Sequence, residues 1–141
     1  MSADFIGTWK LEKSENFSEF LSELGVNFVL RKLVLNMPVT LSFAYDPTTQ
    51  QWTLTLTTLK SNTIVFRIDQ PFEYSEPMGG QVKSHITWDG ETMHQENINS
   101  RIGRPMRISR RIWEQDCGTM LVQKMTIGNV TCTRYFKKEL H

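Results

Sequence analysis

Short segments with the composition of β-strands recur along most of the chain, and this recurrence constrains the fold more than any other feature. Residues 53–57 alternate Thr and Leu, which is the period of a strand with one buried face. Turn-forming residues such as Pro47 and Gly90 separate the segments. We predict ten strands, over residues 5–13, 38–45, 51–58, 62–68, 71–75, 81–87, 91–98, 105–113, 119–125 and 130–138. Their regular spacing is typical of an all-β fold, either an up-and-down sheet, a barrel or a sandwich.

One segment near the N-terminus follows a helical period instead. Four apolar residues recur there at the spacing i, i+3, i+4 and i+7: Phe17, Phe20, Leu21 and Leu24. Asn16 is the expected N-cap, and Gly25 suits the left-handed residue that ends a helix. We predict a second helix over residues 27–35, before Pro38. Helices this short are marginal alone in water, so we expect the pair to pack on the strands as a helix-turn-helix lid.

The composition fits one globular domain over residues 1–141. Its formal net charge of +1 gives no indication of a nucleic-acid partner. No apolar run approaches the ~20 residues that a membrane-spanning helix needs. A barrel of ten antiparallel strands has more interior than an eight-stranded barrel, which side chains just fill. We therefore expect a cavity for an apolar ligand, with the two helices over one mouth.

Several kinds of chemistry lack their usual sequence patterns. The first residues show neither a basic start nor an apolar stretch, so we expect a cytoplasmic protein with the thiols of Cys117 and Cys132 reduced. His85 and His94 fall in neighbouring predicted strands without further residues at metal-ligand spacing. We therefore expect no metal and no cofactor. Neither a nucleophile elbow nor a phosphate-binding glycine loop is present, so we expect no enzymatic activity.

The last predicted strand carries the most informative residue. Val130, Cys132, Arg134 and Phe136 share its more apolar face, which should point inward. An arginine does not lose its charge at neutral pH, and burying it costs several kcal/mol unless it meets an anion. Arg134 is therefore a candidate ligand-binding residue. The alternative is that Arg134 pairs with an Asp or Glu of the protein, or lies in water at the end of the barrel.

A second arginine on a neighbouring strand shows a similar pattern. Ile108, Arg110 and Ile112 alternate with more polar residues, so Arg110 is the expected inward residue. A one-residue bulge would bring in Arg111 and Trp113 instead. If two arginines share an apolar cavity, the site favours a carboxylate, which accepts short charge-assisted hydrogen bonds.

With these residues identified, the sequence resembles the intracellular fatty-acid-binding proteins, relatives of the cellular retinoid-binding proteins. The similarity covers the whole chain in order and is most specific at its two ends. It rests on residues 5–11 at the start, on residues 14–17, 24–26 and 31–32 in the helical region, on residues 59–60, 72–73, 83–84 and 88–90 in the middle, and on residues 131–134 near the end. The resemblance implies a ten-stranded β-barrel (β-clam) with a helical lid, and a long-chain fatty acid or similar hydrophobic acid held inside non-covalently.

The resemblance also implies roles for individual residues. Arg134 matches an arginine that contacts the ligand carboxylate, and the second such arginine falls at Arg110 or Arg111. A tyrosine that completes this group in the family is Phe136 here, which cannot donate a hydrogen bond. The expected cavity and portal residues are Phe17, Phe20, Leu21, Val26, Val29, Leu30, Leu59 and Phe136.

Three hypotheses about function remain open at this stage. The first is a monomeric cytoplasmic fatty-acid carrier. The second is a carrier of another hydrophobic ligand, such as a retinoid or bile acid, and the third is a filled barrel that binds other proteins. A local basic cluster consists of Arg101, Arg104, Arg107, Arg110 and Arg111. It is either a solvated surface or a site for transient contact with anionic membranes. In the second case, the nearby cations Lys10, Lys13, Arg31 and Lys32 would contribute to the contact.

Overall fold

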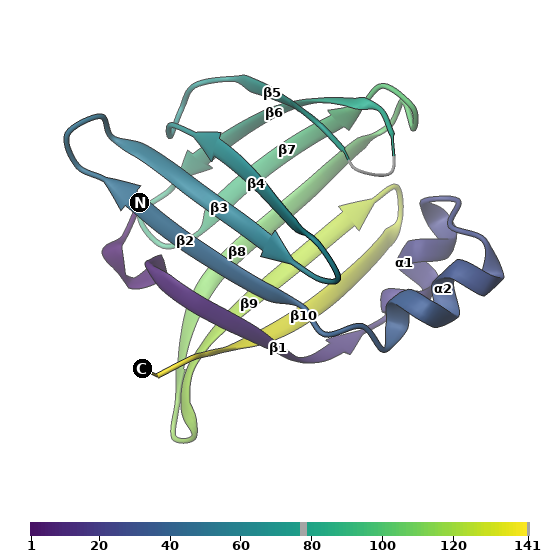
Figure 1. Cartoon of the computed structure of the whole chain (residues 1–141), viewed down its shortest axis with the longest axis horizontal. Coiled ribbons are helices and arrows are strands. Elements are labelled where there is room, and N and C mark those ends of the chain that lie inside the picture. The colour runs from purple at the N-terminus through teal and green to yellow at the C-terminus, as the bar shows by residue number, and fades with distance from the viewer. Residues whose placement is uncertain (77–78, 141) are drawn as a thin grey trace.

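The computed structural model describes residues 1–76 and 79–140, and its main feature is one antiparallel sheet of ten strands (Figure 1). The strands are β1 (Gly7–Glu15), β2 (Thr40–Asp46), β3 (Gln51–Thr57), β4 (Ser61–Phe66), β5 (Phe72–Ser75), β6 (Gln81–Trp88), β7 (Met93–Asn99), β8 (Pro105–Gln115), β9 (Gly118–Ile127) and β10 (Val130–Lys138). Their order in the sheet is β4-β3-β2-β1-β10-β9-β8-β7-β6-β5. The sheet curls into a nearly closed barrel whose two edges are β4 and β5. The predicted fold class is confirmed.

Strand β1 joins the two ends of the chain by pairing with β2 on one side and β10 on the other. A β-bulge lies between Leu11 and Lys13, where Glu12 has no partner on β10. In a regular ladder Lys13 would lie opposite Arg134. The extra residue shifts the register by one, so that Ser14 lies opposite Arg134 and Lys13 opposite Tyr135. The bulge therefore keeps a second cation off the inner face of the barrel at this point.

Two helices follow β1, namely α1 (Phe17–Glu23) and α2 (Phe28–Leu35). Gly25 has a φ of 84°, as expected for the residue that ends α1. The predicted capping role of Asn16 is wrong: its φ is 62°, and its side chain donates to the carbonyl of Thr131 (3.0 Å) instead of capping the helix. Asn27 does cap α2, because its Oδ1 accepts a hydrogen bond from the Leu30 amide (2.9 Å). In the described part of the chain, no helix combines the length and apolar character needed to cross a membrane.

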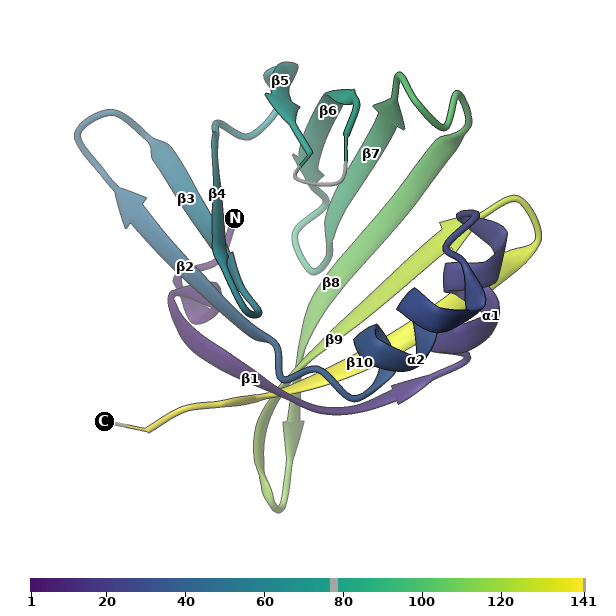
Figure 2. The ribbon, with the colours of Figure 1, turned by 45° about the vertical axis from the view of Figure 1, so that its right-hand side comes forward.

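The helices differ in how they are attached to the barrel. Helix α1 packs on β10 and β9 (Figure 2) and buries Phe17, Phe20 and Leu21. These side chains meet Ile127 and Cys132 in a core cluster at the lid end. Helix α2 packs against α1 and has no buried residue. The lid therefore has one docked helix and one largely exposed helix.

A separate and larger core cluster fills the opposite, closed end of the barrel. A short 3₁₀-helix over Ala3–Phe5, which the sequence did not predict, contributes the fully buried Phe5 to it. The Phe5 ring contacts the rings of Phe43 and Trp88 edge to face, each at 5.8 Å between centroids. The Phe5 carbonyl accepts a hydrogen bond from the indole of Trp9 (3.0 Å). This aromatic packing fills the interior of the barrel at the end away from the helices.

Candidate ligand cavity

A cavity of about 370 Å³ lies between helix α1 and the inner faces of the strands. One wall is apolar and comes from β2, β3 and β4, through Leu41, Leu54, Leu56 and Ile64. The lid adds Phe17, Phe20, Leu21 and Leu24. The facing wall, from β7 to β10, is called the polar wall because it carries Gln95, Asn97, Arg110, Gln123 and Arg134, although Met106, Ile108 and Met125 also line it. The cavity thus has one apolar side and one side rich in hydrogen-bonding groups.

Arg110 lies at the centre of the polar wall and is only 5% exposed. Its Nε donates to Gln123 Oε1 (2.7 Å) and its Nη1 donates to Gln95 Oε1 (2.8 Å). Burial lowers the pKa of the Arg110 guanidinium to about 10, because a low-dielectric environment disfavours the charged form. The group stays charged at neutral pH, so the cavity wall carries a full positive charge.

The hydrogen bonds of Arg110 continue along β7 toward β6. Gln95 Nε2 donates to Asn97 Oδ1 (3.0 Å) and to Ser84 Oγ (3.1 Å). Ser84 in turn donates to Asn97 Oδ1 (2.6 Å), and Asn97 Nδ2 reaches the Tyr74 hydroxyl (3.4 Å). Satisfied networks of this kind fix side-chain orientation in a low-dielectric interior. The network therefore holds the Arg110 guanidinium in one position.

Arg134 lies on β10 at the edge of the same cavity and is 7% exposed. Its Nε donates to Ser14 Oγ (3.0 Å), and its guanidinium carbon lies 3.9 Å above the centre of the Phe17 ring. Burial lowers the pKa of Arg134 to about 10. The hydroxyl contact depends on the β1 bulge, which places Ser14 opposite Arg134.

Both guanidinium groups are held by neutral atoms. Within residues 1–76 and 79–140, no carboxylate oxygen lies within 4.0 Å of Arg110 or Arg134. The register places Gln123 between them on β9, so their Cα atoms are two strand spacings apart, about 10 Å. Side chains as long as arginine can converge across this distance on an anion. The wall therefore carries two buried positive charges that the described residues do not neutralise.

Several residues proposed from the sequence lie away from the cavity. Arg111 points outward and pairs with Glu91 (3.2 Å), and β8 runs without a bulge. Phe136 is fully buried in the closed-end core and does not line the cavity, which corrects its expected position. Val29 and Leu59 are 78% and 80% exposed. Val26 and Leu30 are partly buried in the lid but are also absent from the cavity lining.

The polar partners of the arginines were not identified from the sequence. Gln95 and Asn97 stand on the inward face of β7, where Met93 is the apolar residue that continues the pattern. Their face therefore has no clear apolar signature. Gln123 is recognised only once the pairing of β8, β9 and β10 is known, and Ser14 only once the bulge is known. Across the described chain, no group of three metal-ligating side chains could hold an ion.

Besides the two arginines, two neighbouring titratable residues line the cavity, namely Tyr74 and Glu76. Burial raises the pKa of Tyr74 to about 12, and the nearby Glu76 carboxylate adds to this effect. Burial also raises the pKa of Glu76, while the Tyr74 hydroxyl and Arg101 act in the opposite direction. The phenol of Tyr74 is therefore neutral at physiological pH and can donate a hydrogen bond.

Comparison with known proteins finds relatives that match nearly the whole chain. A model of the lipocalin / cytosolic fatty-acid binding protein family matches residues 6–139. A fatty acid-binding protein of Clonorchis sinensis is 36% identical over 138 residues, covering 98% of this chain and 99% of that protein. One from Tyrophagus putrescentiae is 33% identical over 135 residues, covering 94% and 96%. The crystal structure of Echinococcus granulosus fatty-acid-binding protein 1 superposes with a TM-score of 0.86 at 26% identity, covering 99% and 100% of the two chains.

The position of Ser14 opposite Arg134 yields a first prediction. The substitution Ser14→Glu supplies the carboxylate that Arg134 lacks, and we expect the free energy of unfolding to rise by roughly 1 kcal/mol, since the site is partly exposed. Urea denaturation of the parent protein and the variant measures this difference in the free energy of unfolding. The matched control is Lys13→Glu, one residue away on the outer face, which should not produce the gain. Equal stabilisation by both variants would contradict the register.

The raised pKa of Tyr74 yields a second prediction. Folding favours the protonated phenol, so the free energy of unfolding should fall as pH rises between about 10, the ordinary pKa, and about 12. Ultraviolet titration of phenolate should show a late-ionising tyrosine that Tyr74→Phe removes. A titration curve unchanged by Tyr74→Phe would show that Tyr74 is not the late group.

Proposed function

Because the chain belongs to the lipocalin / cytosolic fatty-acid binding protein family, we propose that it is a cytoplasmic carrier of a long-chain fatty acid, held non-covalently in the barrel cavity. The observation that carries the proposal is the pair of buried guanidinium groups that face the cavity without a carboxylate partner in the described chain. The relatives named fatty acid-binding proteins support the class of ligand.

The two walls of the cavity bind different parts of the ligand. The acyl chain lies against the apolar wall and the lid, where each buried methylene contributes about 0.8 kcal/mol. The carboxylate binds Arg134 and Arg110, directly or through ordered water. Burial of the chain supplies most of the affinity, and the arginines supply the preference for an acid. The cavity volume of about 370 Å³ falls within the usual range of ligand pockets, roughly 300–1,000 Å³.

A different hydrophobic acid is the second candidate. Phe136 lies in the core where the family pattern has a hydrogen-bonding tyrosine, so one expected contact to the head group is lacking. Gln95 and Asn97 in the polar wall suit a ligand with oxygen atoms along its body, such as a bile acid or an acidic retinoid. An alcohol such as retinol would leave the arginine charges unbalanced. The open cavity argues against a filled barrel that acts only through protein partners.

The function proposed here is transport rather than catalysis, and the carrier is expected to act as a monomer. Reversible binding needs only a cavity, a charge to orient the ligand and a lid that opens. The residues of the polar wall serve this purpose through hydrogen bonds and charge, and the proposal assigns none of them a chemical step.

The exposed helix α2 is the proposed point of transient contact with anionic membranes. Phe28, Val29 and Leu33 are 60%, 78% and 60% exposed, and Lys32 Nζ lies 4.5 Å from the centre of the Phe28 ring. Arg31 adds a second cation beside this ring. The basic cluster on β8 and its preceding turn is a weaker candidate: Arg104, Arg107 and Arg111 pair with Glu23, Glu96 and Glu91, while Arg110 points inward.

Ligand competition tests the role of the arginines. Oleate should displace a fluorescent fatty acid from the protein more effectively than methyl oleate, because the ester has no charge to balance Arg134 and Arg110. Arg134→Gln should weaken oleate binding by about tenfold or more and leave methyl oleate unaffected. Arg111→Gln, on the outer face, is the control. Equal competition by acid and ester would remove the arginines from the mechanism.

Transfer kinetics test the membrane contact. Reversing charge in the double variant Arg31→Glu/Lys32→Glu should slow transfer of a fluorescent fatty acid to vesicles containing phosphatidylserine, because attraction of basic residues to anionic lipid is lost. The difference in transfer rate between the double variant and the parent protein should disappear with neutral phosphatidylcholine vesicles. Lys124→Glu, on the outer face of β9, serves as the control. Loss of equilibrium oleate affinity in the double variant would point to a damaged lid instead.

A further inference from the structure

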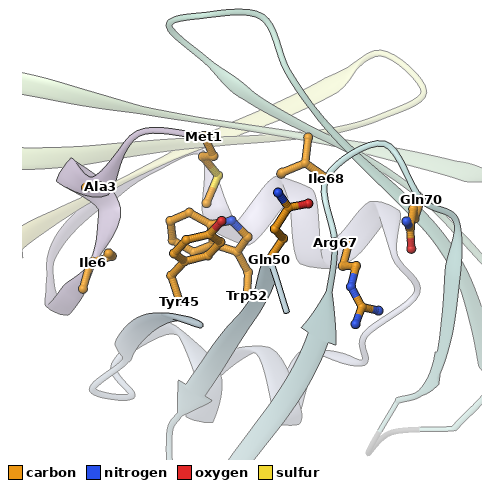
Figure 3. Close-up of a pocket in the computed structure, with 9 residues that line it drawn as sticks. All are labelled: Met1, Ala3, Ile6, Tyr45, Gln50, Trp52, Arg67, Ile68 and Gln70. Carbon is orange, nitrogen blue, oxygen red and sulfur yellow. The ribbon is translucent and has the colours of Figure 1, made fainter. Parts of the chain in front are cut away.

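A second hollow of about 260 Å³ lies at the closed end of the barrel and shares no lining residue with the ligand cavity. It is framed by the N-terminal segment, by the β2–β3 hairpin and by the connection from β4 to β5 (Figure 3). Because the aromatic core of the closed end separates the two spaces, a molecule in this hollow would not compete for space with one in the cavity.

One side of the hollow is an aromatic surface. The ring of Tyr45 lies 4.7 Å from the ring of Trp52, centre to centre, at an angle of 38°. Trp52 is only 3% exposed, whereas Tyr45 is 36% exposed. The Met1 side chain reaches toward the same pair (Figure 3). A flat ring could therefore pack against Tyr45 with a flexible thioether beside it.

The other side of the hollow carries a guanidinium. Arg67 Nε donates to the Thr49 carbonyl (3.0 Å), which fixes the direction of the group. No carboxylate oxygen of the described residues lies within 4.0 Å of it. Its two Nη groups can thus donate to an anion in the paired geometry that carboxylates favour. The Gln50 amide lies between the aromatic pair and Arg67 (Figure 3), where it can add a hydrogen bond.

Each of the two turns that frame the hollow has one residue in the left-handed conformation, which is unusual for Gln50 but common for Asp69. Gln50 has a φ of 59°, and Asp69, which lies between the lining residues Ile68 and Gln70, has a φ of 66°. Side-chain-bearing residues other than Asn and Asp rarely adopt this left-handed conformation, and such residues cluster at ligand sites. Gln50 itself is one of the residues that line the hollow.

We propose that this hollow is a second binding site, for a small aromatic carboxylate whose ring packs on Tyr45 and whose carboxylate binds Arg67. The volume and the mixed polarity of the lining suit one or two rings better than a long acyl chain. This site is additional to the lipid cavity and does not depend on the function proposed for that cavity.

Nuclear magnetic resonance of the full chain can test the site. The probe is naphthalene-2-carboxylate, added to the protein with and without saturating oleate. We expect saturable shifts of the Trp52 indole and of the Gln50 and Gln70 side-chain amides in both samples. Arg67→Gln should weaken the acid about tenfold. The neutral naphthalene-2-carboxamide should bind the parent protein no more tightly than the acid binds Arg67→Gln. Arg107→Gln, on the outer face of β8, is the control and should change nothing.

Three outcomes would overturn the proposal. Shifts confined to Gln95, Gln123 and other cavity residues, and abolished by oleate, would place the probe in the lipid cavity. Equal affinity of the parent protein and Arg67→Gln would remove the charge from the site. Shifts at Trp52 that survive Tyr45→Ala with unchanged affinity would exclude the aromatic surface. Failure of oleate to bind would contradict the proposed carrier function alone, since the shifts at Trp52, Gln50 and Gln70 are read independently.

Discussion

The removal of two guanidinium groups from water is the constraint on which the cavity depends. Neither Arg110 nor Arg134 can lose its proton at neutral pH, so the protein must supply oxygen atoms around each one. Arg110 is held by the amide oxygens of Gln95 and Gln123, and Arg134 by the hydroxyl of Ser14 and the face of Phe17. These neutral groups bind part of each guanidinium but leave its charge in place. The polar wall and the bulge in β1 are both explained by this requirement.

Much of the fold was predictable because its information is local. Period-two alternation located the ten strands to within a few residues, and the apolar spacing of residues 17–24 located α1. The features that were missed depend on pairing between distant segments. The bulge at Glu12 sets the position of Ser14 only through the register with β10, and Asn16 leaves its expected capping role because Thr131 offers a carbonyl. The 3₁₀-helix at residues 3–5 is stabilised by aromatic contacts with β2 and β6, which short-range patterns do not contain.

The lid combines firm and loose attachment. Helix α1 is tied to the barrel by its buried side chains and by Arg104, which donates to Glu23 Oε1 (2.9 Å) and to the Glu23 carbonyl at the helix end (3.0 Å). Helix α2 has no buried residue and rests on α1. Segments with few buried contacts open at the lowest free energy. Movement of α2 is therefore the least costly motion of the lid, and it leaves the contact of Phe17 with Arg134 intact.

The packing also separates the aromatic core of the closed end from the polar wall of the cavity. The closed-end cluster contains Phe5, Trp9, Phe43 and Phe136, whereas the polar wall of the cavity lies outside it. Substitutions in that wall can change its shape and hydrogen bonding while the aromatic cluster maintains the scaffold. A protein organised in this way can diverge in ligand preference through successive single substitutions without passing through an unfolded ancestor.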